Sequence, residues 1–537
     1  MGPRIIAGGL ALSAAVWMAG PAAAATTGGG AAAACSALAG ATVEAGRIAL
    51  PTRGAAVTSA TLTDSPAHGE YCKVLGAIHP VDPTAPDIRF QLNLPTAWNR
   101  KAVQFGGGGY DGTVVTGEAT QWAAPGQLSA IRQGYATFGS DSGHDAAAQG
   151  QDPAAFALNA EAWNNFAKDQ LKKTHDAAGA LIARRYGAAP RRQYFSGGSQ
   201  GGHEGFLVIQ NWPQDYDGVV AFYPVYDLTA LQLNGVLVGQ SLYNTPGAWM
   251  PPEKMAMLHE AVIAACDGLD GAKDGLIANR PACRSGFKIA GLRCPGGGEG
   301  PACLSDAQIG FVGGFASDRK LGITLSGVDT FARWPILEGA DMLRFSLGKQ
   351  ARPSVPPRQA TDATVYFMGD QLTRYAVLGD AKADTLTFKA ADHAAQLEAA
   401  SRTTDASDPD ISRFQARGGK LILVHGTIDT AVTPYNTIAY WERVQARFGA
   451  APLRRFARFF LVPGFGHGDG SFVVGWDALA ALDAWVEKGQ GPDGPVAGDT
   501  ARATAGRTRP LCEYPAWPKY KGAGDAAAAA SFACVAE

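Results

Sequence analysis

A serine in a glycine-rich turn is the first residue of this chain whose surroundings suggest chemistry. Ser199 stands in GGSQG (residues 197–201), which matches the G-x-S-x-G pattern. In that pattern a sharp turn between a strand and a helix exposes a nucleophilic hydroxyl. A strand-like run, QYFS, precedes the motif, and a helix-compatible run, HEGFLVIQNW, follows it. The alternative is a glycine-rich turn with an inert serine, because a chain with 68 glycines matches such patterns by chance.

A nucleophilic serine needs a histidine as base and a carboxylate that orients the histidine. In hydrolases with this motif the chain order is serine, acid, histidine. Beyond the nearby His203, the histidines that follow are His259, His393, His425 and His467. His467 follows the strand-like run FARFFLVPG, and Asp429 follows the strand-like run KLILVHG. Ser199, Asp429 and His467 are therefore predicted at the carboxyl ends of strands, where sites form in open α/β sheets. The alternatives are a turn-capping Asp429 and a surface His467.

A second glycine-rich segment, FGGGGYDG (residues 105–112), follows another strand-like run. Such a loop brings backbone N–H groups close to the oxygen of a tetrahedral intermediate. We expect the amides of Gly108 and Gly109 to form an oxyanion hole together with the amide of Gln200. A nucleotide-binding loop is the competing interpretation, but the segment lacks the G-x-G-x-x-G and G-K-[ST] patterns.

Several elements must position these residues. Strand-like runs occur at residues 88–94, 102–105, 135–138, 193–196, 219–223, 421–424 and 456–462. A helical pattern spans about 154–186 and ends at Gly187. Strands that alternate with helices predict an α/β fold with a mostly parallel sheet covered on both faces.

The middle of the chain differs from its two ends. Between about residues 228 and 405 the strand–loop–helix rhythm fades, and four of the eight cysteines lie there. We predict a catalytic domain formed by residues 26–228 and 406–537 and interrupted by an insertion, residues 229–405.

The N-terminus indicates export from the cytoplasm. Arg4, an apolar stretch over residues 5–18 and an A-x-A site in the alanine run 22–25 predict a signal peptide over residues 1–25. The alternative is a disordered or buried N-terminus. The mature protein is expected to be secreted or periplasmic. No later segment resembles a membrane helix, and a net charge of −2 without a basic run argues against nucleic acid as a partner.

An even number of cysteines in an exported chain suggests disulfides, but their connectivity does not follow from the sequence. The cysteines are Cys35, Cys72, Cys266, Cys283, Cys294, Cys303, Cys512 and Cys534. There is no C-x-x-C pair, so a structural zinc site is not expected.

An acidic loop, CDGLDGAKDGL (residues 266–276), carries Asp267, Asp270 and Asp274 between glycines. Several oxygens in one loop are what Ca²⁺ requires, and the carbonyl groups of Ala272 and Leu276 could complete its coordination. The spacing is not that of an EF-hand, and a solvated acidic turn is the alternative.

Taken together, these motifs resemble the bacterial and fungal tannase and feruloyl esterase family, which also contains a mono(2-hydroxyethyl) terephthalate hydrolase. The similarity rests on ARRYG (183–187), GGSQGG (197–202), CDGLDGAKDGLI (266–277), GGKLILVHGTIDTAVTP (418–434) and PGFGH (463–467). It implies an α/β-hydrolase fold, a catalytic triad of Ser199, Asp429 and His467, and an inserted lid domain over the substrate pocket. It also implies a structural calcium ion on the acidic loop and the disulfide pairs Cys35–Cys72, Cys266–Cys283, Cys294–Cys303 and Cys512–Cys534.

The chain departs from the family pattern at two positions. The family has a cysteine directly before the nucleophile and another directly after the catalytic histidine, and these two are bridged. This chain has Gly198 and Gly468 there. The chemistry does not require the bridge, since many α/β-hydrolases hold their triads by packing and hydrogen bonds.

The resemblance predicts a serine carboxylic-ester hydrolase for small esters of aromatic acids, such as feruloyl, galloyl or terephthalate monoesters. Lid aromatics that could stack on such a ring are Trp249, Trp334, Phe345, Tyr366, Phe367 and Tyr375, although each is individually more typical of a lid core. The alternatives are an aliphatic ester or polyester-oligomer hydrolase on the same scaffold and a catalytically silent binding module.

Overall fold

The computed structural model describes residues 1–2, 28–119, 121–343 and 347–536. Its centre is a ten-stranded sheet in the order β1-β2-β3-β4-β6-β5-β7-β8-β11-β12. In chain order these strands are β1 Thr42–Val43, β2 Ala55–Ser65, β3 Gly69–Ile78, β4 Ile88–Pro95, β5 Lys101–Phe105, β6 Ala136–Ser140, β7 Arg192–Gly198, β8 Gly218–Phe222, β11 Lys420–Gly426 and β12 Ala457–Val462. The seven strand-like runs of the sequence correspond to β4, β5, β6, β7, β8, β11 and β12.

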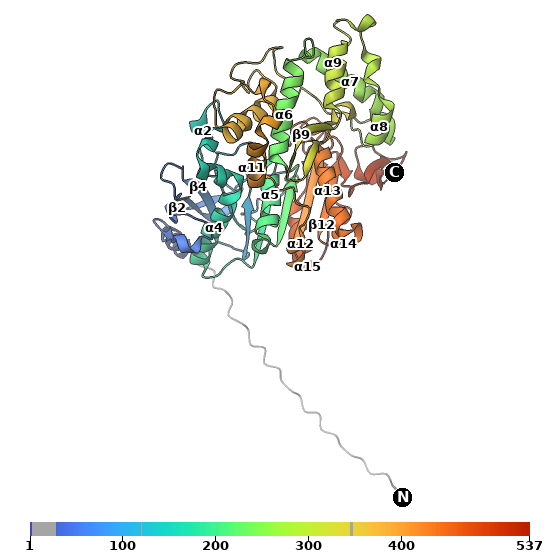
Figure 1. Ribbon diagram of the computed structural model, residues 1–537. Coiled ribbons are helices and arrows are strands. Elements are labelled where there is room, and N and C mark those ends of the chain that lie inside the picture. Colours follow the sequence, from blue (N-terminus) through green and yellow to red (C-terminus); the bar gives the residue numbers. More distant parts are fainter. Residues whose placement is uncertain (3–27, 120, 344–346, 537) are drawn as a thin grey trace.

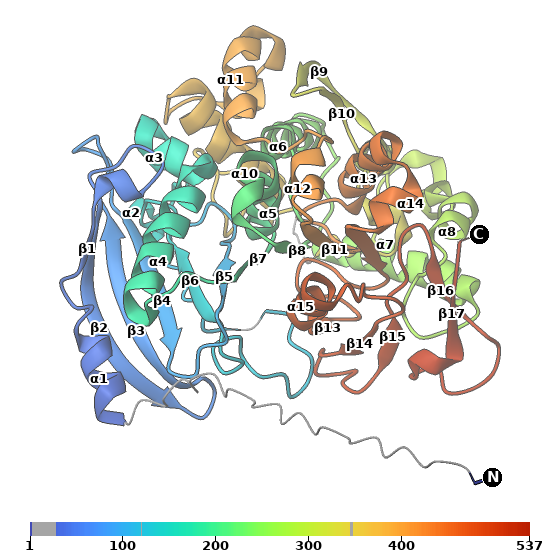
Figure 2. The ribbon, with the colours of Figure 1, turned by 90° about the horizontal axis from the view of Figure 1, so that it is seen from below.

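The sheet is mixed rather than mostly parallel. Pairings from β6 through β5, β7, β8 and β11 to β12 are parallel. Strands β1 to β4 and the β4–β6 pair are antiparallel. The sequence interpretation missed β1, β2 and β3, which form one edge of the sheet, shown in blue in Figure 2. Parallel pairing places the carboxyl ends of β7, β11 and β12 at the same edge.

Apolar side chains on the parallel strands alternate between the two faces of the sheet, as strand geometry requires. One face packs against helices α5 (Gln200–Asn211) and α13 (Pro434–Phe448), and the other packs against α15 (Ala478–Lys488). On β8, for example, Val219 and Ala221 belong to the first core and Val220 and Phe222 to the second. The short helices α12 (Ser412–Ala416) and α14 (Ala450–Arg454) flank β11 and β12.

The long helix predicted over residues 154–186 is divided into shorter elements. A 3₁₀ turn (Ala155–Leu158) and α3 (Ala160–Asn164) are followed by a π-helical turn (Asn165–Asp169) and then by α4 (Gln170–Tyr186). The break before α3 has a local cause, because the side chain of Asn159 accepts a hydrogen bond from the amide of Ala162 and caps a new helix. Gly187 ends α4 with a φ of 70°.

The chain between β8 and β11 forms a layer over the carboxyl ends of the sheet strands (Figure 1, green to orange). Its elements are α6 (Leu228–Tyr243), α7 (Pro252–Cys266), α8 (Arg280–Gly286), α9 (Asp306–Phe315), β9 (Arg319–Leu325), β10 (Val328–Phe331), α10 (Thr364–Leu372) and α11 (Ala394–Thr404). Most of its buried side chains belong to one hydrophobic cluster, centred on α6. Residues 229–405, predicted as the lid, contain all of these elements except the first residue of α6.

The remaining helices and strands lie outside the inserted segment. They are α1 (Gly28–Ser36) and α2 (Ala146–Gln149), with β13 (Val474–Gly475), β14 (Val496–Asp499), β15 (Thr508–Pro510), β16 (Trp517–Tyr520) and β17 (Phe532–Val535) toward the C-terminus. Four disulfides join Cys35 to Cys72, Cys266 to Cys283, Cys294 to Cys303, and Cys512 to Cys534. These are the pairs that the family resemblance implies.

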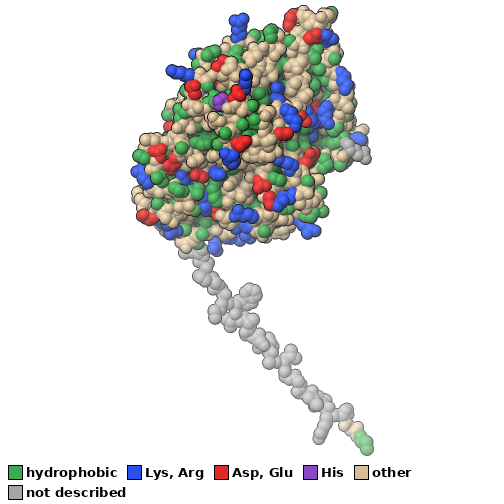
Figure 3. Space-filling model, viewed as in Figure 1, with side chains coloured by type: hydrophobic (Ala, Val, Ile, Leu, Met, Phe, Trp, Pro, Cys, Tyr) green, Lys and Arg blue, Asp and Glu red, His purple; other side chains and the backbone are tan. Residues whose placement is uncertain are grey.

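Basic and acidic side chains are interspersed on the face shown in Figure 3, in keeping with a net charge of −2. Among the residues with described placement, no helix combines the length and the apolar character needed to cross a bilayer. Nearly all of the predicted signal peptide, residues 3–25, lies outside the described residues.

Candidate active site

Ser199 sits on a strained turn between β7 and α5. Its backbone has φ 60° and ψ −122°, a conformation that L-residues rarely adopt. The neighbouring glycines are required by close packing, because a Cβ added at Gly197 would lie 2.5 Å from the backbone of Gly201. One added at Gly201 would lie 2.9 Å from the backbone of Gly106. The sequence GGSQG thus permits the tight turn that presents the Ser199 hydroxyl, which is partly exposed.

The structure brings together the three residues predicted as a triad. The Ser199 hydroxyl lies 2.8 Å from Nε2 of His467, and Nδ1 of His467 lies 2.9 Å from Oδ2 of Asp429. A carboxylate oxygen only accepts, so Nδ1 carries the proton and Nε2 is left to accept from the serine hydroxyl. Asp429 and His467 stand on the loops that follow β11 and β12. This geometry allows the imidazole to withdraw a proton from Ser199.

Asp429 is held as a buried carboxylate. Its side chain is fully buried, and Oδ1 accepts hydrogen bonds from the amides of Ala431 and Val432 at 2.8 and 2.9 Å. Burial alone raises the pKa of Asp429, but the charges and hydrogen bonds of His467 and His425 outweigh burial and hold the pKa far below its ordinary value. Asp429 therefore stays ionised across the pH range in which proteins are stable.

Two of the three predicted oxyanion donors face the same pocket as the serine. Gly109 and Gln200 line that pocket together with Ser199 and His467. Gly108 does not line it, and both Gly108 and Gly109 are exposed. The assignment of the Gly108, Gly109 and Gln200 amides to an oxyanion hole stays a prediction.

Two buried carboxyl groups, those of Glu204 and Asp111, lie next to the glycine loop. Oε2 of Glu204 accepts a hydrogen bond from the amide of Gly107 at 3.0 Å, and Oε1 accepts one from the Gln170 side chain at 2.8 Å. Burial raises the pKa of Asp111 to about 7 and, with the charge of Asp111, raises that of Glu204 well above its ordinary value. The two groups titrate as a coupled pair, and burial favours the protonated form of each. The sequence interpretation did not include them.

The pocket beside Ser199 encloses about 410 Å³ and lies between the sheet and the inserted segment. Its described lining is largely apolar, with Val225, Leu228 and Met368 among the contributors. Glutamine side chains supply polar groups, and that of Gln200 is buried without a hydrogen-bond partner among the described residues. An apolar cavity with a few polar groups is typical of a small-molecule site.

Of the lid aromatics expected to stack on a substrate ring, only Trp334 lines the pocket. Phe345 lies outside the described residues. Tyr366, Phe367 and Tyr375 are buried, and Trp249 packs against the lid core. The aromatic that the sequence did not single out is Tyr110, which follows the glycine loop and reaches the pocket.

An aromatic pair occupies the space beside Gly198 and Gly468. A Cβ added at Gly198 would lie 2.5 Å from the Trp122 ring, and one added at Gly468 would lie 3.0 Å from the Tyr223 hydroxyl. Trp122 donates a hydrogen bond from Nε1 to the Tyr223 hydroxyl at 3.0 Å. The Tyr223 ring centroid is 4.5 Å from that of His467. The pair therefore links the serine turn to the histidine loop, where the family pattern has a disulfide.

The acidic loop has the donor types that calcium prefers, but its carboxylates are already engaged. Oδ1 of Asp267 accepts from the amide of Gly275 at 2.8 Å, both oxygens of Asp270 accept from loop amides, and Asp274 contacts Arg509. Burial and the nearby carboxylates raise the pKa of Asp270 to about 6. Within the described ranges, no group of three or more His, Cys, Asp or Glu is arranged to hold a metal ion.

The backbone of the same loop offers two further oxygens. Ala272 and Leu276 are buried, and neither carbonyl accepts a hydrogen bond from any residue in the described part of the chain. Unpaired buried carbonyls are uncommon and are suitable ligands for a hard cation. The oxygen atoms of this loop are therefore of the type that binds calcium. In this structure, however, the three carboxylates do not point toward one common position.

The strained serine turn, the hydrogen-bonded triad and the sheet order define a serine hydrolase of the α/β-hydrolase fold. Comparison with known proteins narrows this class. A family model described as tannase and feruloyl esterase matches residues 72–535. The chain belongs to that family.

The similar proteins cover nearly the whole chain. An uncharacterized esterase of Agrobacterium fabrum is 40% identical over 522 residues, covering 93% of this chain and 92% of its own. The mono(2-hydroxyethyl) terephthalate hydrolase of Piscinibacter sakaiensis is 32% identical over 524 residues, covering 87% of this chain and 85% of its own. The crystal structure of feruloyl esterase B from Aspergillus oryzae has the same fold, with a TM-score of 0.76 at 23% identity, covering 94% of this chain and 100% of that chain.

Proposed function

We propose that this protein hydrolyses small esters of aromatic acids through an acyl-enzyme formed on Ser199, with His467 as base and Asp429 as its orienting carboxylate. The observation that carries the proposal is the continuous hydrogen-bonded path from the Ser199 hydroxyl through His467 to Asp429, with distances of 2.8 and 2.9 Å, at the wall of a pocket. The relatives named for aromatic ester hydrolysis support the acyl class.

In the first step the Ser199 oxygen bonds to the ester carbonyl carbon while its proton passes to Nε2 of His467. Asp429 stabilises the imidazolium that forms. The carbonyl oxygen becomes an oxyanion, and we assign its stabilisation to the backbone amides of Gly109 and Gln200, which both line the pocket. The bond to the alkoxy oxygen then breaks, and His467 returns the proton to the leaving alcohol. Water repeats the sequence on the acyl-enzyme, which releases the acid and restores Ser199.

The pocket lining supports an aromatic acyl group that carries hydroxyl substituents. Trp334 and Tyr110 offer ring surfaces, and apolar side chains form most of the remaining wall. The buried, unpartnered amide of Gln200 can both donate to and accept from a phenolic hydroxyl. Feruloyl and galloyl esters carry such hydroxyls, so we expect them to be preferred over acyl groups that lack one.

The test is hydrolysis of methyl ferulate, methyl gallate, mono(2-hydroxyethyl) terephthalate and a short aliphatic ester by the purified protein. We expect selective turnover of an aromatic ester and a loss of at least about 10³-fold in the Ser199→Ala variant. Ser285→Ala changes an exposed serine on α8 and is the matched control. Turnover of only the aliphatic ester would keep the serine mechanism and refute the substrate class. No turnover, together with no labelling by a serine-directed phosphonate, would favour a binding module.

We also propose that the acidic loop binds a structural calcium ion through Asp267, Asp270 and Asp274 and the carbonyl oxygens of Ala272 and Leu276. The two carbonyls without hydrogen bonds and the number of carboxylates in one loop support this assignment. Calcium would stabilise the start of the lid and has no part in the ester chemistry.

The calcium proposal is tested by the melting temperature of chelator-treated protein with and without added Ca²⁺. We expect Ca²⁺ to raise the melting temperature and Asp267→Asn to abolish that rise. Asp329→Asn, on an exposed strand of the lid, is the control. Equal melting temperatures with and without Ca²⁺ would mean that Arg509, which already contacts Asp274, supplies the positive charge instead.

Export to the periplasm or beyond is the third part of the proposal. The four disulfides support it, because such bonds persist in oxidising compartments. N-terminal sequencing of the mature protein tests it, and a mature chain that begins near residue 26 is the expected result.

A further inference from the structure

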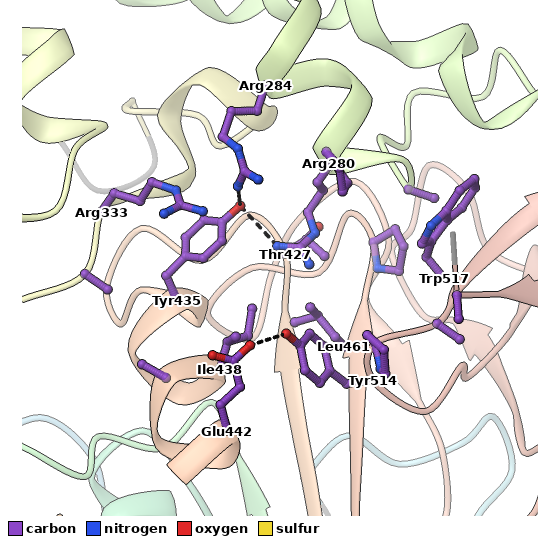
Figure 4. Close-up of a pocket in the computed structure, with 18 of the residues that line it drawn as sticks. Arg280, Arg284, Arg333, Thr427, Tyr435, Ile438, Glu442, Leu461, Tyr514 and Trp517 are labelled. Carbon is purple, nitrogen blue, oxygen red and sulfur yellow. Dashed lines mark hydrogen bonds between the residues drawn. The ribbon is translucent and has the colours of Figure 1, made fainter. Parts of the chain in front are cut away.

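A second pocket, of about 450 Å³, lies apart from the catalytic one and shares no lining residue with it. It is formed where α8 and neighbouring lid segments meet α13, the end of β12 and the C-terminal segment before β16 (Figure 4). Its volume falls in the range of small-molecule sites. None of the steps of the proposed ester hydrolysis uses it.

The lid side of this pocket carries three arginines around one tyrosine. Arg280 and Arg284 each donate to the Tyr435 hydroxyl, at 3.2 and 3.4 Å, and the Arg333 guanidinium lies 3.9 Å from the centroid of the Tyr435 ring. Figure 4 shows the three side chains converging on this tyrosine from the lid. Tyr435 in turn donates to the buried carboxylate of Glu338.

The acidic groups near the three arginines do not fully neutralise the positive charge of the arginines. Glu338 lies 3.7 Å from Arg284 and 3.9 Å from Arg333, and Arg333 also lies 3.5 Å from Asp318. Arg280 has no carboxylate within ion-pair distance among the residues whose placement is described. Three guanidinium groups therefore face two carboxylates, which leaves a positive charge at this end of the pocket. A guanidinium presents paired N–H donors that match the two oxygens of a planar carboxylate.

The opposite side of the pocket has different chemistry. Figure 4 shows Tyr514 and Glu442 below the arginines and Trp517 to one side, with Ile438 and Leu461 between. The Tyr514 hydroxyl donates to Oε1 of Glu442 at 2.9 Å, and the second carboxylate oxygen of Glu442 can accept from a ligand. Aromatic and aliphatic walls between a cationic end and an acceptor end suit a flat ring.

We propose that this pocket binds a hydroxy-aromatic carboxylate, with the carboxylate at Arg280 and Arg284 and the phenolic hydroxyl directed toward Glu442. The ring lies against the aromatic and aliphatic walls. The ligand class is inferred from the lining of this pocket and does not depend on the proposed function. It is, however, the class of acid that hydrolysis of an ester of a hydroxy-aromatic acid would release.

The test is titration calorimetry of the full chain with 4-hydroxybenzoate and with its neutral analogue, 4-hydroxybenzamide. We expect saturable binding of the acid, weakened at least about tenfold in Arg280→Gln/Arg284→Gln, since each charged hydrogen bond contributes more than a neutral one. Arg402→Gln, an exposed arginine on α11, is the matched control. Circular dichroism and the melting temperature check that the variants fold.

Glu442→Gln supplies an independent variant on the scaffold side. It should weaken binding of 4-hydroxybenzoate and leave binding of benzoate, which has no hydroxyl, unchanged. Equal affinity of the wild type and Arg280→Gln/Arg284→Gln for the acid would overturn the proposal, as would equal affinity of the wild type for the acid and the amide. The binding test involves no ester hydrolysis. A negative binding result therefore does not refute the esterase proposal, and a negative esterase assay does not refute the proposed binding of a hydroxy-aromatic carboxylate.

Discussion

Replacement of Tyr223 tests whether the aromatic pair beside the triad positions His467 or only fills the core. Tyr223 is 6% exposed, its ring centroid lies 4.5 Å from that of His467, and its hydroxyl accepts from Trp122. Tyr223→Phe keeps the ring and removes one hydrogen bond, which should cost about 1 kcal/mol of stability. Tyr223→Leu removes the ring, which should lower the free energy of unfolding by about 2–3 kcal/mol. It also removes the aromatic surface that packs against the imidazole of His467.

The two variants should separate in activity as well as in stability. A displacement of the imidazole of the order of 1 Å lowers the rate about 10–100-fold, so we expect that loss of kcat in Tyr223→Leu, with little change in KM. Tyr223→Phe should keep most of the wild-type kcat. The assay is steady-state hydrolysis of the best ester from the panel, with the melting temperature measured on the same samples. A Tyr223→Leu protein with a lowered melting temperature and wild-type kcat would refute the positioning role.

Three further results are expected. Asp429→Asn should lower kcat about 10⁴-fold with little change in KM, because the amide cannot hold the histidine tautomer or offset its charge; a loss under tenfold would refute this role. Gly198→Ala should lower the melting temperature, because the new methyl group would lie 2.5 Å from the Trp122 ring; an unchanged value would show that the ring can move. The raised pKa values of Asp111 and Glu204 imply stability that is complete near pH 4 and is lost as the pH rises through about 7. Glu204→Gln should flatten the decline in melting temperature between about pH 4 and 7, and an unaltered decline would place its origin elsewhere.

The residues at the centre of the site could be predicted from sequence because each stands directly after a strongly apolar strand. Ser199, Asp429 and His467 follow β7, β11 and β12, and strand ends are local features that periodicity reveals. Gly108, Gly109 and Gln200 were predicted as oxyanion donors from two contiguous motifs, a glycine loop and the turn after the serine, and Gly109 and Gln200 line the pocket.

The parts that escaped prediction have different causes, and one of them is a contact between distant segments. Trp122 lies in a loop with no periodic signal, and only the folded chain brings it against Gly198 and Tyr223. The helix over residues 154–186 was predicted as continuous because its apolar spacing is uninterrupted, whereas the side chain of Asn159 caps a new helix. Strand β2 is half-exposed and polar enough to look like a loop, whereas β3 is mostly buried and no local feature of its sequence explains why it was missed.

The placement of the lid between β8 and β11 has a consequence for how the chain acquires its structure. These two strands are hydrogen-bonded neighbours, yet the whole inserted segment separates them in sequence. The serine half of the sheet therefore exposes an unpaired edge until the segment from Lys420 onward arrives and docks. Closing so long a connection is slow, and an open apolar edge is prone to aggregate in the meantime. Variants that slow collapse of the lid should therefore reduce the yield of native enzyme, even when the finished molecule is as stable as the parent.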